Sequence, residues 1–342
     1  MELDDIDKNL LNIIQADFPL SQEPFTALGL RLGITNKEAI QRVEQLKAKG
    51  IIRLIGPVLN PTKLGYQTTL IAMKILPEQV NEAGQIISTH PMVSHCYERD
   101  HDFNFWFTLA MPVAEDIESK VHELGTKIKA EATLNLPAVK TFKIGTYFNL
   151  TRGNSSLSLR AKRGNLNANP SHRDCFVAHA PRNDNKLSAI DRVVINALQQ
   201  DLPLSEKPFD LIAERLSMNS EEFLSRCQTL LQRRIMRRFS ASINHNKLGF
   251  TANAMACWRV PSDTVEAAGK KIAALPQISH CYQRQTSPIW PYNLFAMIHA
   301  EAKETCQAIA DKICSDTGLD KNRLILLFST KEIKKTRVRY PV

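Results

Sequence analysis

The sequence predicts an α+β protein built as a tandem duplication, each copy a winged helix-turn-helix domain followed by a ferredoxin-like βαββαβ domain. The string LDDIDKNLLNIIQADFPLSQEPF, from Leu3, matches LSAIDRVVINALQQDLPLSEKPF, from Leu187, at an offset of 184. The tetrapeptide SHCY at 94–97 recurs at 279–282. Identities at a nearly fixed offset indicate an internal duplication. The order of helix-like and strand-like periodicity inside each copy then predicts the fold.

Each copy opens with three predicted helices and a strand. The first helix begins behind Asp4 or Asp5, either of which can cap it, and carries an apolar stripe with helical spacing. A second helix is predicted over 24–32, and a third over 35–50, where a glycine ends it. Residues 51–59 read as a strand. Three helices and a β wing are typical of a winged helix-turn-helix.

The rest of each copy alternates between strand and helix patterns in the order βαββαβ, which is typical of a ferredoxin-like sandwich. The second copy repeats this order over 251–330. In the first copy we expect strands at 68–75, 93–99, 104–110 and 140–148, and helices at 77–88 and 113–130.

The predicted domain boundaries follow from the two repeats. Residues 151–186 are rich in Asn, Ser, Arg and Gly and lack apolar periodicity, so we expect a disordered basic linker that tethers the copies. The predicted divisions are 1–62 and 187–246 for the winged helix-turn-helix domains, 63–150 and 247–342 for the α/β domains, and 151–186 for the linker.

Composition is that of a globular protein, with 43% hydrophobic and 23% charged residues. The net charge of +9 is uneven, because residues 1–150 hold 15 Lys/Arg against 18 Asp/Glu, whereas 187–342 hold 22 against 15. The basic character therefore belongs to the linker and the second copy. No apolar run reaches the length of a membrane span, and the acidic start lacks a signal peptide, so we expect a cytoplasmic protein.

Cysteine usage indicates reduced thiols. The seven cysteines are scattered, form no CxxC motif and are odd in number. We therefore expect mostly buried free thiols, and no zinc or iron–sulfur site.

The domain order resembles the Lrp/AsnC family of amino-acid-responsive bacterial regulators, and this resemblance covers both copies. Three longer strings are similar to the siroheme decarboxylases, which share that fold: SHCYERDHDFNFWFTLAM from Ser94, SHCYQRQTSPIWPYNLFAMIHA from Ser279, and RRIMRRFSASINHNKLGFTANAMACW from Arg233. The resemblance implies removal of two acetate carboxylates from siroheme, giving 12,18-didecarboxysiroheme in heme or heme d1 biosynthesis. It also implies a fused pair of subunits, an internal pseudo-dimer. Further association of whole chains stays open.

DNA binding is not expected, although the fold suggests it. The candidate recognition helix of copy two starts with Glu221 and Glu222, whose carboxylates repel phosphate. The first copy is net acidic. We therefore expect the helix-turn-helix domains to act as a packing scaffold.

A siroheme site needs an apolar slot with cations at its rim, and an acid near each reacting acetate. No separate cofactor is expected, because the macrocycle takes up the electrons and brings its own iron. Copy two offers most of the candidates, since copy one has Pro61 where copy two has His245. The candidates on the wing and its exit are Arg234, Arg237, Arg238, His245 and Lys247. A solvated basic strand, or leftover DNA contacts, is the alternative for the arginines.

Alternating polar residues on one strand of each copy complete the candidates. His280, Tyr282 and Arg284 project from one face of a strand, as do His95, Tyr97 and Arg99. We predict His245, His280 and Tyr282 as catalytic, with His245 and His280 as acid/base or iron-facing groups. Arg284 is predicted to bind a carboxylate. The remaining substrate-binding candidates are Trp290 in the copy-two insertion SPIWPY, Asn293 directly after it, and His101, with Asn104, at a pocket lip of copy one. The other histidines we expect to be structural or exposed: His90, His122, His172, His179 and His299.

Three functions stay open on these residues. The first is the decarboxylase. The second is a transcriptional regulator, which predicts salt-dependent binding to a palindromic duplex. The third is a tetrapyrrole sensor or carrier without turnover, in which His245 and His280 are axial ligands only.

Overall fold

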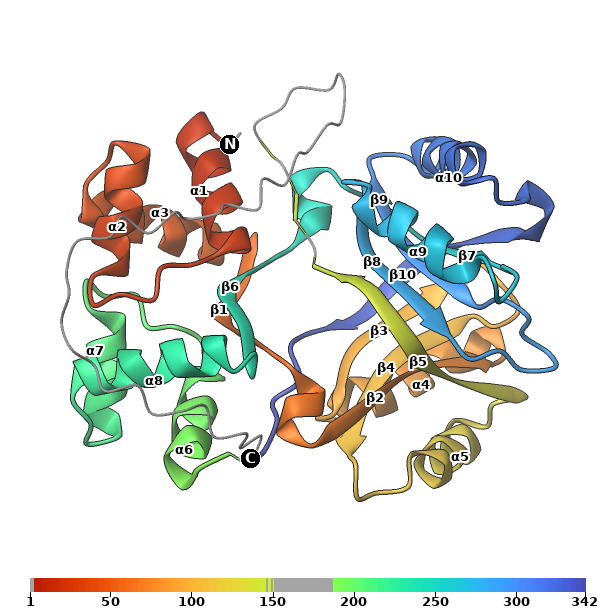
Figure 1. Ribbon diagram of the computed structural model, residues 1–342, viewed down its shortest axis with the longest axis horizontal. Coiled ribbons are helices and arrows are strands. Elements are labelled where there is room, and N and C mark those ends of the chain that lie inside the picture. The colour runs from red at the N-terminus through yellow and green to blue at the C-terminus, as the bar shows by residue number, and fades with distance from the viewer. Residues whose placement is uncertain (1–2, 146, 149, 151–186) are drawn as a thin grey trace.

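The computed structural model describes residues 3–145, 147–148, 150 and 187–342 (Figure 1). The predicted linker, 151–186, lies outside the described residues, as do Cys175, His172 and His179. Within the described part, no helix is long and apolar enough to cross a membrane. The six cysteines there are all buried and free.

Both copies begin with the predicted three helices and wing strand. Asp4 caps the first helix, because its carboxylate accepts a 2.7 Å hydrogen bond from the Asp7 amide. The elements of copy one are α1 (Asp5–Ala16), α2 (Pro24–Leu32), α3 (Asn36–Ala48) and β1 (Ile52–Leu59). Those of copy two are α6 (Ala189–Leu198), α7 (Pro208–Arg215), α8 (Ser220–Gln232) and β6 (Met236–Ile243).

The two winged helix-turn-helix domains share one hydrophobic core. β1 and β6 pair antiparallel as a two-stranded ribbon between them. Each copy also docks on the other's wing: the Phe18 amide donates to the Phe239 carbonyl (2.8 Å), and the Leu202 amide donates to the Ile55 carbonyl (3.1 Å). One cluster of buried side chains runs through all six helices and the ribbon. The copies are therefore one packed unit.

Each α/β domain has the predicted βαββαβ order. Copy one contains β2 (Tyr66–Lys74), α4 (Val80–Thr89), β3 (Val93–Arg99), β4 (Phe105–Pro112), α5 (Ile117–Ile128) and β5 (Ala132–Ile144). Copy two contains β7 (Ala252–Trp258), α9 (Val265–Ala274), β8 (Ile278–Arg284), β9 (Leu294–Ala300), α10 (Lys303–Thr317) and β10 (Leu324–Lys335). Short 3-10 turns precede some of them: η1 (Pro61–Leu64), η2 (Pro77–Gln79), η3 (His245–Leu248) and η4 (Lys321–Arg323).

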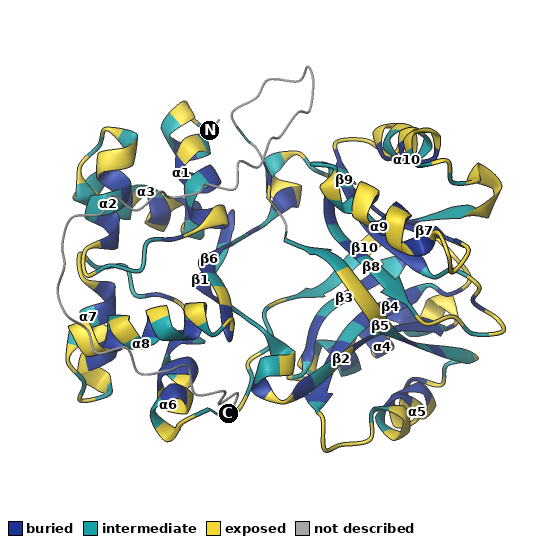
Figure 2. Cartoon of the chain, viewed as in Figure 1, coloured by how far each residue is buried: buried dark blue, intermediate teal, exposed yellow. Residues whose placement is uncertain are grey.

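The last strand of each copy crosses from its own sheet to the sheet of the other copy. β5 pairs with β2 over its first half and with β8 over its second, while β10 pairs with β7 and then with β3. The predicted strand 140–148 therefore begins eight residues too late, because the part of β5 that pairs with β2 was missed. Leu134 and Leu136 are buried there, whereas residues 138–141 are exposed at the crossing (Figure 2).

Helices cover the outer faces of the paired sheets, with one core beneath the helices of each sheet, and a further core lies between the inner faces. α4 and α5 pack on the copy-one sheet, and α9 and α10 on the copy-two sheet. Between the sheets lie side chains of both copies, among them Trp106, Met255 and Trp290. Polar residues on the inner faces are therefore held between the two copies.

Arg234 illustrates a local difference between the copies. It follows α8 with φ of 56°, and the equivalent residue after α3 is Gly50, with φ of 66°. A left-handed conformation costs a non-glycine residue about 1–2 kcal/mol. We expect Arg234→Gly to raise the free energy of unfolding by about 0.5–1 kcal/mol, because the strain exceeds the extra entropy of an unfolded glycine. Urea unfolding measures this, and a loss of stability would contradict it.

Candidate functional site between the two copies

The two predicted trios face the space between the sheets. Cys96 lies in the core beneath α4 and α5, and Cys281 lies in the core beneath α9 and α10. Because alternate residues of a strand point to opposite faces, the trios on either side of these cysteines point inward. Trio one is His95, Tyr97 and Arg99; trio two is His280, Tyr282 and Arg284.

Each trio forms a stacked ladder. In trio two the rings of His280 and Tyr282 are 6.2 Å apart and nearly parallel, and the Arg284 guanidinium lies 4.7 Å from the centre of the Tyr282 ring. Arg284 Nη1 donates to the Leu136 carbonyl of the other copy (2.7 Å). Trio one repeats the pattern, with Arg99 Nη1 donating to the Leu327 carbonyl (2.8 Å). Burial lowers the pKa of both arginines to about 10.

His245 opens η3, directly after the wing strand β6, and is 1% exposed. Its Nδ1 lies 2.9 Å from Nζ of Lys335, the last residue of β10. Its ring stacks on Phe148, with centroids 5.5 Å apart and an interplanar angle of 5°. Its Nε2 is buried without a hydrogen-bond partner among the described residues.

A fourth histidine joins this group. His299 of β9 lies 5.0 Å from His245, ring centre to ring centre. The Ser279 hydroxyl lies 2.9 Å from His299 Nε2 and 3.0 Å from His280 Nδ1, and so links the two rings. Lys335 acts electrostatically on all four rings. We call Lys335 and its four histidines the histidine–lysine cluster: His95, His245, His280, His299 and Lys335.

The two halves of this space differ in charge. In the strand register Lys335 lies opposite His95 and Ile144 lies opposite His280, so Lys335 and Ile144 are equivalent positions. By the same register, Glu332 beside trio one corresponds to Thr141 beside trio two.

Glu332 neutralises a cation beside trio one. It accepts a 2.6 Å charge-assisted hydrogen bond from Arg53, whose guanidinium also donates to the Lys335 carbonyl. Tyr97 and Arg99 are buried there, whereas Tyr282 and Arg284 keep part of their surface exposed. Trio two is thus the more open and the less neutralised half.

The interior carries more positive charge than its acids can balance. Of the partly or fully buried cations here, only Arg53 has an ion pair with a carboxylate among the described residues, its 2.6 Å pair with Glu332. A buried charge without a counterion is costly unless a ligand supplies one. The cations are Arg53, Arg99, Arg238, Arg284, Lys335 and Arg337.

The two wing arginines, Arg237 and Arg238, point to opposite faces of β6, as neighbouring residues of a strand do. Arg237 is exposed and donates to Asn60 (3.3 Å), whereas Arg238 is half-buried and reaches Gly145 and Ser240. Burial and the neighbouring Arg237 lower the pKa of Arg238. Arg238 is therefore the wing arginine closest to the interior.

Five predicted substrate-binding residues lie apart from the cluster. Lys247 donates to the Lys49 carbonyl at the end of α3 (2.5 Å). Asn293 exchanges two hydrogen bonds with the backbone of Val260, as Asn104 does with Ile75. The other three are Arg234, which is exposed after α8, His101, which is exposed and meets Trp290 edge-on, and Trp290, which is buried between the sheets.

The recognition helices present little free positive charge. Arg42 of α3 is held by three carboxylates, those of Asp4, Asp7 and Glu38, at 2.7–2.9 Å. α8 begins with the carboxylates Glu221 and Glu222. Because DNA binding depends on cations facing phosphate, this geometry favours the scaffold role that the sequence suggests.

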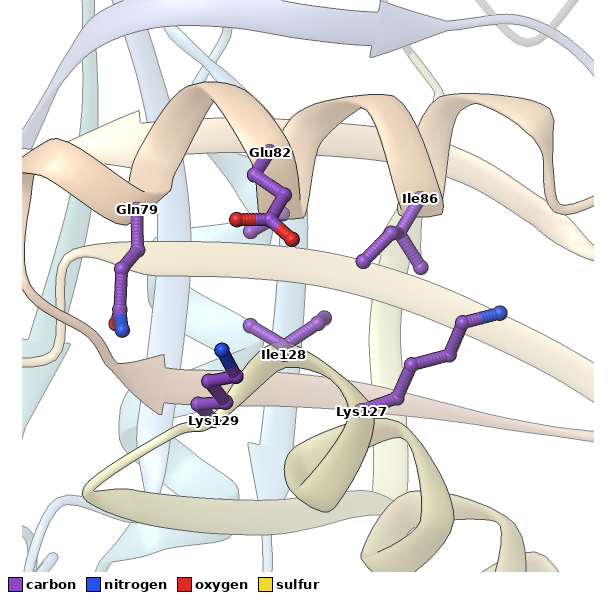
Figure 3. Close-up of a pocket in the computed structure, with 7 residues that line it drawn as sticks. Gln79, Glu82, Ile86, Lys127, Ile128 and Lys129 are labelled. Atoms are coloured by element: carbon purple, nitrogen blue, oxygen red, sulfur yellow. The ribbon is translucent and has the colours of Figure 1, made fainter.

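A pocket lies between α4 and the end of α5, on the outer side of the copy-one sheet (Figure 3). Gln79, Glu82, Ile86 and residues 127–129 line it. Its volume of about 10 Å³ admits at most a water molecule. It is unrelated to the histidine–lysine cluster.

The cluster is expected to make the stability of the protein sensitive to acid. Burial, with the charge of Lys335, lowers the pKa of His95 and His245 to about 3 and that of His280 to about 4. Since these folded pKa values lie below the ordinary 6.5, the stability from the neutral rings is complete above pH 6.5 and is lost as the pH falls toward 4. We expect the free energy of unfolding to fall by roughly 2 kcal/mol between pH 7 and 5 for each ring that stays neutral, because the unfolded ring takes up its proton over about 1.5 pH units of this range at about 1.4 kcal/mol per unit. Urea unfolding across this range measures it. The fall should be smaller in His245→Gln, and an equal fall in that variant would count against the cluster as its source.

Sequence reasoning missed four residues of this site. His299 was expected to be structural, because a lone histidine in an apolar strand usually is. Lys335 and Glu332 lie in the charged run KEIKK, which is typical of a solvent-exposed chain end. Arg53 carried no sequence feature that marked it as a site residue, apart from its equivalence to Arg237. The pairing of β10 with β3 brings Lys335 and Glu332 beside trio one.

Comparison with known proteins agrees with both halves of this architecture. The model of a siroheme decarboxylase NirDL-like HTH domain matches residues 7–53 and 191–237, and that of an AsnC-like ligand binding domain matches 63–143 and 247–334. The siroheme decarboxylase of Hydrogenobacter thermophilus is 36% identical over 332 residues, covering 97% of this chain and 93% of that protein. The chain belongs to the siroheme decarboxylase family.

Other members of the family show both the fused and the single-copy form. The siroheme decarboxylase beta subunit of Methanosarcina barkeri is 39% identical over 149 residues, which is 44% of this chain and 97% of that subunit. A crystal structure of the siroheme decarboxylase NirDL in complex with an iron-uroporphyrin III analogue has a TM-score of 0.68 and 34% identity. It covers 99% of this chain and 95% of that one. The duplication in this chain thus matches a two-copy arrangement within the family.

Proposed function

We propose that this protein is a carboxy-lyase that removes two acetate carboxylates from siroheme, giving 12,18-didecarboxysiroheme. The observation that carries the proposal is the positive interior between the copies. Four histidines and six cations lie there, and Glu332 is the one carboxylate that pairs with any of those cations in the described residues. A flat ligand edged with carboxylates supplies the missing negative charge. Membership of the siroheme decarboxylase family supports decarboxylation as the class of reaction.

The trio-two half is proposed to hold the substrate carboxylates. Arg284 and Arg238 have no carboxylate within 4 Å among the described residues, and Arg284 and Tyr282 keep exposed surface. Arg53, by contrast, is neutralised by Glu332. One substrate site per chain follows from this difference, and it is built mainly on copy two.

The chemistry requires a proton for each carboxylate lost. As the C–CO2 bond breaks, its electron pair passes into the macrocycle, and the methylene carbon then takes a proton to become a methyl group. His245 and His280 are the proposed donors, because each neutral ring carries one N–H proton and lies among the cations that would hold the substrate carboxylates. The negative charge of the substrate favours return of a proton to each ring after it has donated. We propose that no cofactor besides the substrate's own iron is needed.

Anaerobic incubation with siroheme, followed by mass spectrometry and absorption, tests this function. We expect a product lighter by two CO2 per molecule. An unchanged mass with a shifted absorption spectrum would instead indicate a tetrapyrrole sensor or carrier. An unchanged mass and an unchanged spectrum would overturn the siroheme assignment, and salt-dependent binding to duplex DNA would then favour a regulator.

A further inference from the structure

The contact between Lys335 and His245 assigns a tautomer to the histidine. Nζ of Lys335 lies 2.9 Å from His245 Nδ1. An ammonium group can donate but cannot accept, so Nδ1 must be the acceptor. A neutral imidazole whose Nδ1 accepts carries its proton on Nε2, the atom that is buried without a partner among the described residues.

The surroundings hold the His245 ring in this orientation. Phe148 stacks on one face, and His299 meets the ring at 74°. The ring is 1% exposed, so these packed neighbours restrict a turn that would exchange its two nitrogens. The Nε2–H bond of His245 therefore keeps one orientation.

Lys335 can give up a proton near neutral pH. Burial lowers its pKa to about 8; the carboxylate of Glu332 opposes this shift, and the guanidinium of Arg53 adds to it. The titratable and charged groups facing the pair come from strands of both copies: Arg53 of β1, His95 of β3, His280 of β8, His299 of β9 and Glu332 of β10.

The pair of Lys335 and His245 has no counterpart at the equivalent positions of copy one. The position equivalent to Lys335 is Ile144, since the two residues lie opposite His95 and His280. The position equivalent to His245 is Pro61, at the start of η1. Copy one therefore has neither member of the pair.

We propose that Lys335 is a positioning residue that holds His245 in its Nε2–H tautomer and replaces the proton that His245 gives to the substrate carbon. This inference rests on the proposed function. As the C–CO2 bond breaks, the Nε2–H bond breaks and the new C–H bond forms. Nδ1 takes a proton from Nζ of Lys335, which leaves the ring neutral and Lys335 a neutral amine. Before the second decarboxylation Nδ1 returns its proton to Nζ of Lys335 and Nε2 takes a proton from solvent, which restores the ammonium and the Nε2–H tautomer.

Nitrogen NMR of the full chain, labelled with 15N-histidine, tests the tautomer without substrate. The His245 signals are assigned by their loss in His245→Gln. We expect a protonated Nε2 and an unprotonated Nδ1 in the wild type, and a mixture of tautomers in Lys335→Met. A wild-type ring protonated on Nδ1 would overturn the proposal whether or not siroheme is the substrate.

The pH dependence of turnover tests the proton supply. Lys335→Met should lower kcat about 10- to 100-fold, change KM less, and remove the alkaline fall in rate near pH 8. Lys335→Arg should keep the Nε2–H tautomer of His245. It should not replace the proton that His245 gives up, because a guanidinium does not deprotonate. The matched control is Lys334→Met, whose lysine donates to the His90 carbonyl instead. Unchanged kcat and an unchanged alkaline limb in Lys335→Met would overturn the proton-supply role. If the wild type does not turn over siroheme, the function fails, while the tautomer result still stands by itself.

Discussion

Replacing His245 by glutamine is expected to lower the rate of siroheme decarboxylation by about 10²- to 10⁴-fold, the usual contribution of a positioned general acid. The ring lies among the cations that would hold the substrate, and its pKa responds to the charge beside it. Glutamine fills most of the same volume and keeps a hydrogen-bonding group beside Lys335. The loss should therefore appear in kcat, with KM changed much less, when product is followed by mass under anaerobic conditions.

His122→Gln is the matched control for this variant. His122 is exposed on α5 and lies on the outer side of the copy-one sheet. We expect wild-type kinetics from it. If His245→Gln also kept the wild-type rate, the proton donor would have to be another group, and the account of the cluster would be wrong.

Replacing Trp290 by alanine is expected to destabilise the fold by about 3–5 kcal/mol, the usual cost of emptying a buried aromatic position. Trp290 is 2% exposed and packs against Trp106, Phe103 and Tyr292, at 5.2–5.8 Å between ring centres. Two of these rings belong to copy one, so the substitution loosens the contact between the two sheets. The free energy of unfolding in urea measures the effect.

Ile289→Ala is the control, because this neighbour is 60% exposed and should change stability by less than about 0.5 kcal/mol. The sequence predicted Trp290 as a substrate-binding residue. A variant with near wild-type stability but weak tetrapyrrole binding would restore that role. A large loss of stability with intact residual binding supports the packing role.

Local patterns in the sequence predicted the fold well. The repeat, the helix stops at glycine and the apolar alternation are local, and they led to the winged helix-turn-helix and βαββαβ order that the structure has. The start of β5 was wrong for a physical reason. Its first half pairs with β2 and its second half with the other copy, and pairing between distant segments leaves no periodicity that distinguishes it from a loop.

The site was less predictable than the fold. The trios could be recognised because three polar residues alternate on one strand. The partners of His245 could not, because Lys335 lies 90 residues away along the chain and reaches the interior through β10. Asn293 was predicted to bind substrate, but its side-chain amide is already hydrogen-bonded at both ends. Its oxygen accepts from the Val260 amide, and its nitrogen donates to the Val260 carbonyl.

One tetrapyrrole is proposed to bind at the histidine–lysine cluster between the copies. Anaerobic titration of the protein with siroheme, followed by absorption, measures how many bind. We expect saturation at one macrocycle per chain. We also expect binding weaker by roughly tenfold or more in Arg284→Met, since a hydrogen bond to a charged group contributes about 1.5–3 kcal/mol. Saturation at two macrocycles per chain, or full affinity in Arg284→Met, would contradict this proposal.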